Sequence, residues 1–76
     1  MQSISNKAKI GNNVTIGQFV IIEDNVEIGD NVFIGDFTVI RSGSRIGENC
    51  KIKSYNEIRN NVIIGENSSF GSRCTL

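Results

Sequence analysis

The side chains that usually carry out catalysis or hold metals are scarce in this sequence. The chain has no histidine, which removes the commonest general base and the commonest metal ligand. Its cysteines, Cys50 and Cys74, stand in no Cys-x-x-Cys pair and in no cluster of potential ligands, so we expect neither a metal site nor a redox site. Any chemistry would therefore rest on amides, carboxylates, a phenol and cations, and the elements that position them decide what they can do.

Length and charge limit the classes of protein to consider. Seventy-six residues allow a single domain, expected over residues 1–76, whose core alone is only marginally stabilising, so oligomerisation is an expected source of stability. Eight basic and eight acidic residues balance, which argues against nucleic-acid and membrane-surface partners. The sequence contains no long apolar run and no export signal, so we expect a cytoplasmic protein.

The charges are distributed unevenly along the chain. Residues 1–40 carry two basic and five acidic side chains, and residues 41–76 carry six and three. We therefore expect an acidic end and a basic end of the molecule. If the ends carry open sheet edges, this arrangement is compatible with salt-dependent head-to-tail association.

A large apolar residue returns at every sixth position. Isoleucine occupies each of these positions from Ile4 to Ile64, and Phe70 and Leu76 continue the series. Six residues advance an α-helix by roughly 600°, which would scatter these side chains, whereas on a strand six is a multiple of the two-residue alternation. The isoleucines therefore point to one side of short strands. A chain that turns every six residues around one internal row is a solenoid.

Glycine and asparagine mark the turns between these strands. Seven of the eight glycines directly follow the periodic residue. Two positions after the glycine site stands one of six asparagines: Asn13, Asn25, Asn31, Asn49, Asn61 and Asn67. Both residue types enter positive φ at low cost, so we expect tight left-handed turns at these places.

Exceptions to the hexad recur every 18 residues. The glycine is replaced at Ser5, Glu23, Arg41 and Arg59, and the asparagine is replaced at Phe19, Phe37 and Tyr55. Lys53 is the one further glycine replacement that does not follow this spacing. Three hexads therefore form one coil. The pattern predicts an all-β triangular prism of about four 18-residue coils with stacked parallel strands.

Five apolar side chains are expected on the outside of one side of this prism. Phe19, Phe37 and Tyr55 stack in one column, and Ile21 and Val39 stack in the next. A prism of this size has no second layer of chain to cover them, so they indicate an interaction surface. Each could contribute about 1.5 to 3 kcal/mol if a neighbouring molecule buried it.

Three further columns carry specific expectations. Asn56 falls in the internal column of Val20 and Thr38, where its amide either pairs with buried backbone or faces a ligand. The first alternative is favoured because buried amides are usually satisfied internally. Lys9, Glu27 and Arg45 form an alternating charged ladder on an outer face, and the two cysteines fall in different columns, so no disulfide between them is expected.

The motifs "IGNNVTIGQFV", "IGDNVFIGDF", "IGENCKI" and "IGENSSFGSRC" resemble those of the bacterial hexapeptide-repeat transferases over the whole chain. The resemblance implies a left-handed parallel β-helix and a homotrimer, here packed through Phe19, Ile21, Phe37, Val39 and Tyr55. It also implies transfer of an acyl group from a thioester such as acetyl-CoA to a sugar or amino sugar, at clefts between neighbouring protomers.

The sequence departs from this family in having no histidine base and no loop that interrupts the coils. An amine substrate could act as its own nucleophile while Asn56, Tyr55 or Glu57 orients it. Alternatively, the chain is a coil segment of a larger enzyme. In either case the cations that would suit coenzyme A phosphates are Arg41, Lys53, Arg59 and Arg73. The competing interpretation is a non-catalytic trimerisation or stacking scaffold.

Overall fold

The computed structural model describes residues 2–75, which form only short parallel strands and the turns between them. The strands have two residues each: Ser3–Ile4 (β1), Lys9–Ile10 (β2), Thr15–Ile16 (β3), Ile21–Ile22 (β4), Glu27–Ile28 (β5), Phe33–Ile34 (β6), Val39–Ile40 (β7), Arg45–Ile46 (β8), Lys51–Ile52 (β9), Glu57–Ile58 (β10), Ile63–Ile64 (β11) and Ser69–Phe70 (β12). Within the described range there is no helix, and hence none with the length and apolarity to cross a membrane.

The strands form three parallel sheets that make the three sides of a prism. Sheet A has the order β1-β4-β7-β10, sheet B the order β11-β8-β5-β2, and sheet C the order β12-β9-β6-β3. Paired residues are 18 apart, as in Ile4↔Ile22 and Ile22↔Ile40. Each coil therefore contributes one strand to every sheet, and the 18-residue coil predicted from the sequence is confirmed.

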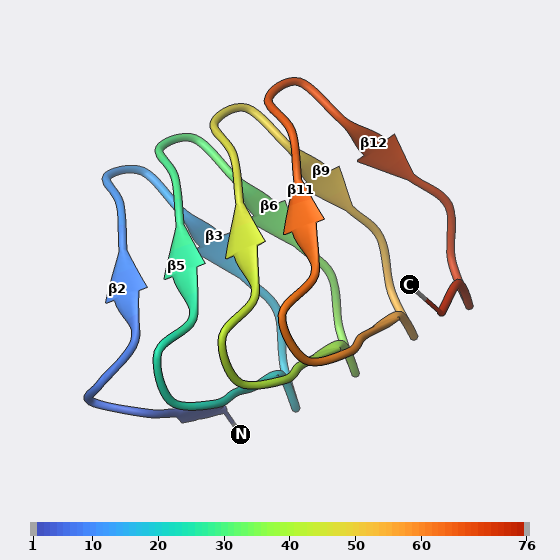
Figure 1. Cartoon of the computed structure of the whole chain (residues 1–76). Coiled ribbons are helices and arrows are strands. Elements are labelled where there is room, and N and C mark those ends of the chain that lie inside the picture. The colour runs from blue at the N-terminus through green and yellow to red at the C-terminus, as the bar shows by residue number, and fades with distance from the viewer. Residues whose placement is uncertain (1, 76) are drawn as a thin grey trace.

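The coils wind in a left-handed sense. In Figure 1 the chain rises along the front strands of sheet B, passes over the top to the rear strands of sheet C, and returns below while it advances from the N-terminus to the C-terminus. The fold is the left-handed parallel β-helix that the family resemblance implied.

The periodic isoleucines form the core of the prism. Ile22, Ile34, Ile40, Ile52 and Ile58 are almost completely buried, together with valines of the neighbouring internal columns. Burial of each such side chain contributes about 1.5 to 3 kcal/mol. In the first coil, Ile4 and Ile10 are each 37% exposed. Coverage by an adjacent coil therefore determines how much each periodic residue stabilises the fold.

Polar residues inside the prism pair with backbone carbonyls 15 residues further along the chain. The hydroxyl of Thr38 donates to the carbonyl oxygen of Lys53 at 3.1 Å, and the hydroxyl of Ser44 donates to that of Arg59. The thiol of Cys50 lies 3.1 Å from the carbonyl oxygen of Gly65 in the same way. The interior tolerates these residues because their polar atoms are satisfied.

The corners follow the predicted left-handed turns for asparagine but not for most glycines. All six turn asparagines have φ values between 58° and 62°. Among the glycines only Gly43, which stands in an asparagine column, has a positive φ, at 79°. The expectation that the glycines after the isoleucines adopt positive φ is therefore wrong.

Close stacking of the coils explains the glycines instead. A Cβ atom built on Gly29 would lie 2.9 Å from the backbone nitrogen of Glu48 and 3.0 Å from the carbonyl carbon of Gly47. A Cβ atom on Gly35 would lie 2.7 Å from the carbonyl carbon of Lys53. These distances are well below the usual carbon contact of about 3.5 Å, so a side chain at these positions would push neighbouring coils apart.

Candidate functional site

The predicted aromatic column is present at the corner where sheet C passes into sheet A. The rings of Phe19 and Phe37 stack with centroids 5.0 Å apart and planes 11° apart, and those of Phe37 and Tyr55 stack at 5.1 Å and 7°. The guanidinium of Arg73 lies over the Tyr55 ring at 5.4 Å and continues the column. We call Phe19, Phe37, Tyr55 and Arg73 the aromatic column, and the corner that holds them the aromatic corner.

The aromatic column is exposed and stands on unfavourable backbone. Phe19, Phe37 and Tyr55 are 49%, 46% and 51% exposed. Their φ values are 58°, 58° and 63°, in the left-handed region. The structurally equivalent residues at the other two corners are mainly asparagine and glycine, for which this region costs little. Bulky side chains there cost roughly 1 to 2 kcal/mol per residue. Stacking of the rings on one another still leaves about half of each residue exposed.

Sheet A continues the apolar surface beside this corner. Ile21 on β4 is 41% exposed, and Val39, its register partner on β7, is partly exposed. Both side chains point outward, since the isoleucine that follows each of them is buried. The five residues predicted to form one surface are therefore contiguous. Whether another molecule covers them stays a prediction.

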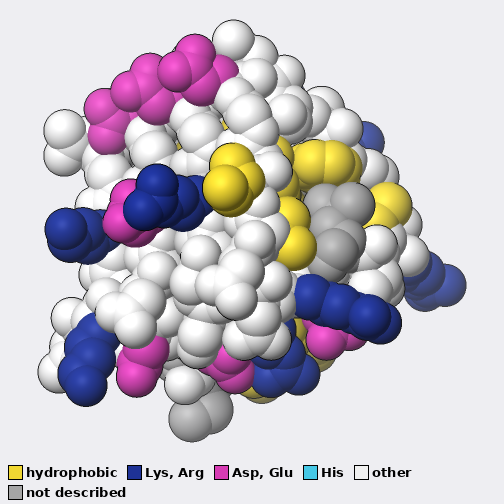
Figure 2. Space-filling model, in the orientation of Figure 1, with side chains coloured by type: hydrophobic (Ala, Val, Ile, Leu, Met, Phe, Trp, Pro, Cys, Tyr) yellow, Lys and Arg dark blue, Asp and Glu magenta, His cyan; other side chains and the backbone are white. Residues whose placement is uncertain are grey.

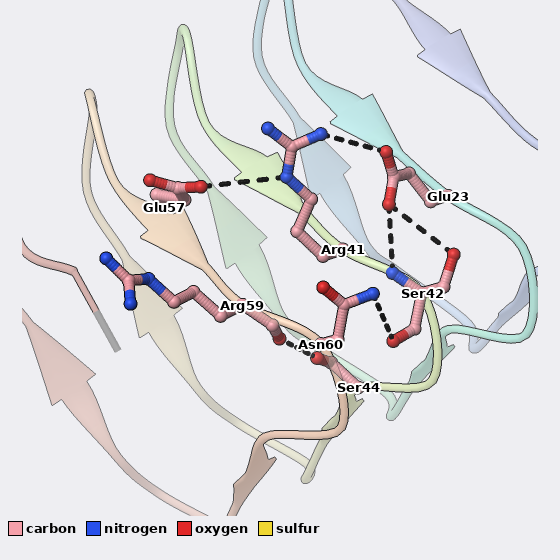
Figure 3. A network of polar contacts seen from close by, with 7 residues as sticks. All are labelled: Glu23, Arg41, Ser42, Ser44, Glu57, Arg59 and Asn60. Atoms are coloured by element: carbon pink, nitrogen blue, oxygen red, sulfur yellow. Dashed lines mark hydrogen bonds and ion pairs between the residues drawn. The ribbon is translucent and has the colours of Figure 1, made fainter.

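An ion-pair network borders sheet A at its other corner (Figure 3). Arg41 donates from Nη1 to Oε2 of Glu23 at 2.9 Å, and its Nε lies 3.6 Å from Oε2 of Glu57. Oε1 of Glu23 accepts hydrogen bonds from the backbone N–H and the hydroxyl of Ser42. The Arg41 hydrogen bond, assisted by Ser42, lowers the pKa of Glu23, and Glu23 in turn raises the pKa of Arg41.

Comparison with protein families matches both halves of this architecture. A family model described as bacterial transferase hexapeptide (six repeats) matches residues 7–42 and again residues 43–76. The chain belongs to this family. Each match spans about two coils, so together they cover the three sheets and the aromatic corner. No curated protein matches the chain.

The cations expected to bind phosphates in a hexapeptide-repeat transferase are not brought together. Arg41 and Arg59 lie at the corner between sheets A and B, while Lys53 and Arg73 lie at the aromatic corner. Arg41 is flanked by two carboxylates, which compete with any anionic ligand. In Figure 3 the Arg59 guanidinium points away from this network. Sheet A therefore separates two pairs of cations.

Of the three candidates for orienting a substrate, one is buried, and both ends of its amide are hydrogen-bonded to backbone groups. Asn56 is 3% exposed, its amide nitrogen donates to the carbonyl of Lys53 at 2.8 Å, and its amide oxygen accepts the backbone N–H of Cys74 at 2.7 Å. It has the backbone-pairing role that the sequence favoured. Tyr55 and Glu57 reach the surface, and their orienting role stays a prediction.

The outer face of sheet B is charged, whereas that of sheet A carries the apolar Ile21 and Val39. The predicted ladder is present on sheet B, where Arg45 lies 3.9 Å from Glu27 and Lys9 is the register partner of Glu27. Figure 2 shows this face with charges of both signs and an acidic row along its upper edge. An open groove of about 490 Å³ follows the same face, and none of the predicted site residues lines it. Residues 2–75 contain no cluster that could hold a metal ion.

The folded arrangement also corrects the expected polarity of the prism. The coil of residues 19–36 carries five acidic and no basic residues, and the coil of residues 37–54 carries four basic residues and one acidic residue. The first coil carries two lysines and no acidic residue. The acidic charge therefore lies in the second coil and not at an end, and the contrast between an acidic end and a basic end is wrong.

Sequence reasoning missed one exposed aromatic residue. Phe33 on β6 points outward from sheet C and is 41% exposed. Its column holds Thr15, Lys51 and Ser69, so no repeated apolar column drew attention to it. The sequence did contain a signal for it. Phe33 directly precedes the periodic Ile34, and strand alternation directs the residue before a buried isoleucine to the surface.

Proposed function

We propose that the chain is a self-associating β-helix module of a hexapeptide-repeat acyltransferase and that it works as a homotrimer through the aromatic corner and sheet A. The observation that carries this proposal is the aromatic column. Three stacked rings are half exposed at backbone positions that favour asparagine or glycine. A partner that buries them would offset this conformational cost.

The energetic argument supports association over an isolated monomer. A domain of 76 residues buries a smaller share of its surface than a larger one and is correspondingly marginal in stability. Full burial of a large apolar side chain contributes about 1.5 to 3 kcal/mol, so a neighbour that covers the exposed half of each of these residues contributes about half of that. The exposed apolar side chains of the aromatic column and sheet A therefore provide a source of stability that the single prism lacks.

The test is a measurement of mass in solution by light scattering. The wild-type chain should have the mass of a trimer, and Phe37→Asp should produce monomers or aggregates because a charge would then lie in the contact. Ile63→Asp is the matched control, since Ile63 is 76% exposed on sheet B, away from the aromatic corner. A wild-type chain that stays monomeric and folded refutes the proposal.

Acyl transfer is the chemistry that family membership favours. The acyl donor would be a thioester such as acetyl-CoA, and the acceptor a sugar or an amino sugar. An amine acceptor suits this chain best, because an amine is a competent nucleophile once bound and the chain contains no histidine. Lys53, Arg59 and Arg73 are better placed than Arg41 for phosphate binding, since Arg41 is already paired with carboxylates.

Incubation with acetyl-CoA and a panel of amino sugars tests the chemistry directly. Release of free thiol above the uncatalysed rate, reduced by Tyr55→Phe or Glu57→Gln, would support transfer. Absence of turnover, together with absence of coenzyme A binding in calorimetry, would favour the scaffold alternative. We also propose a cytoplasmic location, which the unpaired Cys50 and Cys74 support because disulfides are rare there.

A further inference from the structure

A cation extends the aromatic column beyond its last ring. The guanidinium of Arg73 lies over the Tyr55 ring, 5.4 Å from its centroid. The backbone of Arg73 has a φ of 63°, in the left-handed region, where the two preceding corner positions hold Asn61 and Asn67. Arginine enters this region much less readily than asparagine, and residues held in such conformations cluster at functional sites. Its place at this corner therefore calls for a reason beyond the turn itself.

The aromatic column runs nearly straight along the prism. Successive ring centroids are 5.0 and 5.1 Å apart, and the ring planes differ by at most 11°. These steps are close to the spacing of about 4.8 Å between paired strands, whereas a steeply inclined column would have clearly longer steps. The Arg73 guanidinium, stacked on the last ring, therefore lies at about the same distance from any line parallel to the prism as the rings do.

This geometry brings three guanidinium groups together in the homotrimer. Three copies that meet through their aromatic corners, with their prisms parallel to the threefold axis, place the three columns around that axis, since a closed symmetric assembly repeats one contact. Because each column is nearly straight, the Arg73 of every protomer then lies beside the axis. Within residues 2–75 of its own chain, Arg73 has no carboxylate at ion-pair distance. Three exposed cations converge at one end of the columns.

We propose that the three Arg73 side chains of a trimer bind one polyvalent oxyanion of the phosphate type on the threefold axis. Like charges held close together repel one another, and a shared anion offsets this repulsion. The planar guanidinium suits such an anion, because its N–H groups can donate in pairs to oxyanion oxygens. The inference rests on the trimer of the proposed function. It goes beyond that function because the anion belongs to the assembly and is neither acyl donor nor acceptor, which gives Arg73 a role separate from that of Lys53 and Arg59.

The number of anions bound per chain is the decisive measurement. Pyrophosphate is titrated calorimetrically into the full chain at constant ionic strength, because salt screens exposed charges. The wild type should bind about one pyrophosphate per three chains, and Arg73→Gln should abolish this binding. Arg59→Gln is the matched control, since Arg59 is also exposed and lies at the other corner of sheet A; it should keep the wild-type stoichiometry. Arg73-dependent binding of one anion per chain overturns the axial site.

The response of assembly to the anion is a second measurement. Light scattering over a range of protein concentrations gives the dissociation of the trimer with and without pyrophosphate. Without it, Arg73→Gln should dissociate less readily than the wild type, because the repulsion is gone. With it, the order should reverse, since the anion stabilises only the wild-type trimer. An Arg73→Gln trimer that dissociates more readily than the wild type in both conditions overturns the inference, because Arg73 would then pair directly with the neighbouring protomer.

The possible results separate this inference from the function on which it rests. A trimeric wild type without Arg73-dependent binding of pyrophosphate overturns the axial site while the trimer stands. A wild type that is folded and monomeric, with and without pyrophosphate, overturns both proposals.

Discussion

Close stacking of the coils at glycine predicts that two chemically identical substitutions change the free energy of unfolding in opposite directions. Gly29 and Gly65 stand in the same column, directly after a periodic isoleucine. A Cβ atom on Gly29 would lie 2.9 Å from the nitrogen and 3.1 Å from the Cα atom of Glu48. A Cβ atom on Gly65 would have no described atom within 4 Å. Neither glycine has a positive φ, so backbone conformation does not distinguish them.

The expected magnitudes follow from this difference. Gly29→Ala forces the backbone of the next coil to move, and overpacking of this kind typically costs about 1 to 3 kcal/mol. Gly65→Ala restricts the unfolded chain without a clash, which stabilises by about 0.4 to 1 kcal/mol. In a domain of this size 1 kcal/mol shifts the melting temperature by roughly 4 to 8 °C. The two variants should therefore differ by at least about 1.4 kcal/mol, which separates their melting temperatures by about 6 °C or more.

Thermal unfolding followed by circular dichroism measures this difference. Both variants and the wild type are compared at one protein concentration, because self-association makes the melting temperature depend on concentration. Urea denaturation at 25 °C gives an independent estimate of the free energy of unfolding. Equal effects of the two substitutions, or a Gly29→Ala variant as stable as the wild type, would show that coil stacking does not explain the glycines.

Three other changes have clear expected outcomes. Phe37→Asn should relieve about 1 kcal/mol of backbone strain yet weaken self-association, so light scattering should show more monomer; an unchanged mass would contradict the assigned contact. Arg41 lowers the pKa of Glu23, so the stability that this carboxylate contributes is present above its unfolded pKa of 4.5 and is lost as the pH falls through the lower folded value. In denaturation at several pH values, the difference in free energy of unfolding between the wild type and Glu23→Gln should therefore shrink in acid. A difference that stays constant would refute the pairing. Asn56→Leu leaves the N–H of Cys74 without its side-chain acceptor and should cost about 1 to 3 kcal/mol in urea denaturation, with faster hydrogen exchange at Cys74; unchanged exchange would show that the amide does not hold the last coil.

Predictions from the sequence succeeded where a feature depends on spacing along the chain. The strands, the 18-residue coil and the stacked rings of Phe19, Phe37 and Tyr55 all follow from alternation and the length of one coil. The site was predicted less completely. Phe33 was missed because its column contains no second apolar residue, and the four predicted cations turned out to lie at two different corners.

The amino-acid sequence by itself determined the repeat, the parallel β-solenoid and the column in which each side chain lies, because strand alternation and coil length are set by local spacing. Only the tertiary structure showed that the glycines after the isoleucines allow close stacking of the coils. It also showed which backbone groups the Asn56 amide hydrogen-bonds, and that Arg41 lies between Glu23 and Glu57. These features depend on distances of a few ångströms between coils. Residues 18 apart in the sequence become neighbours only when the chain has closed a full turn.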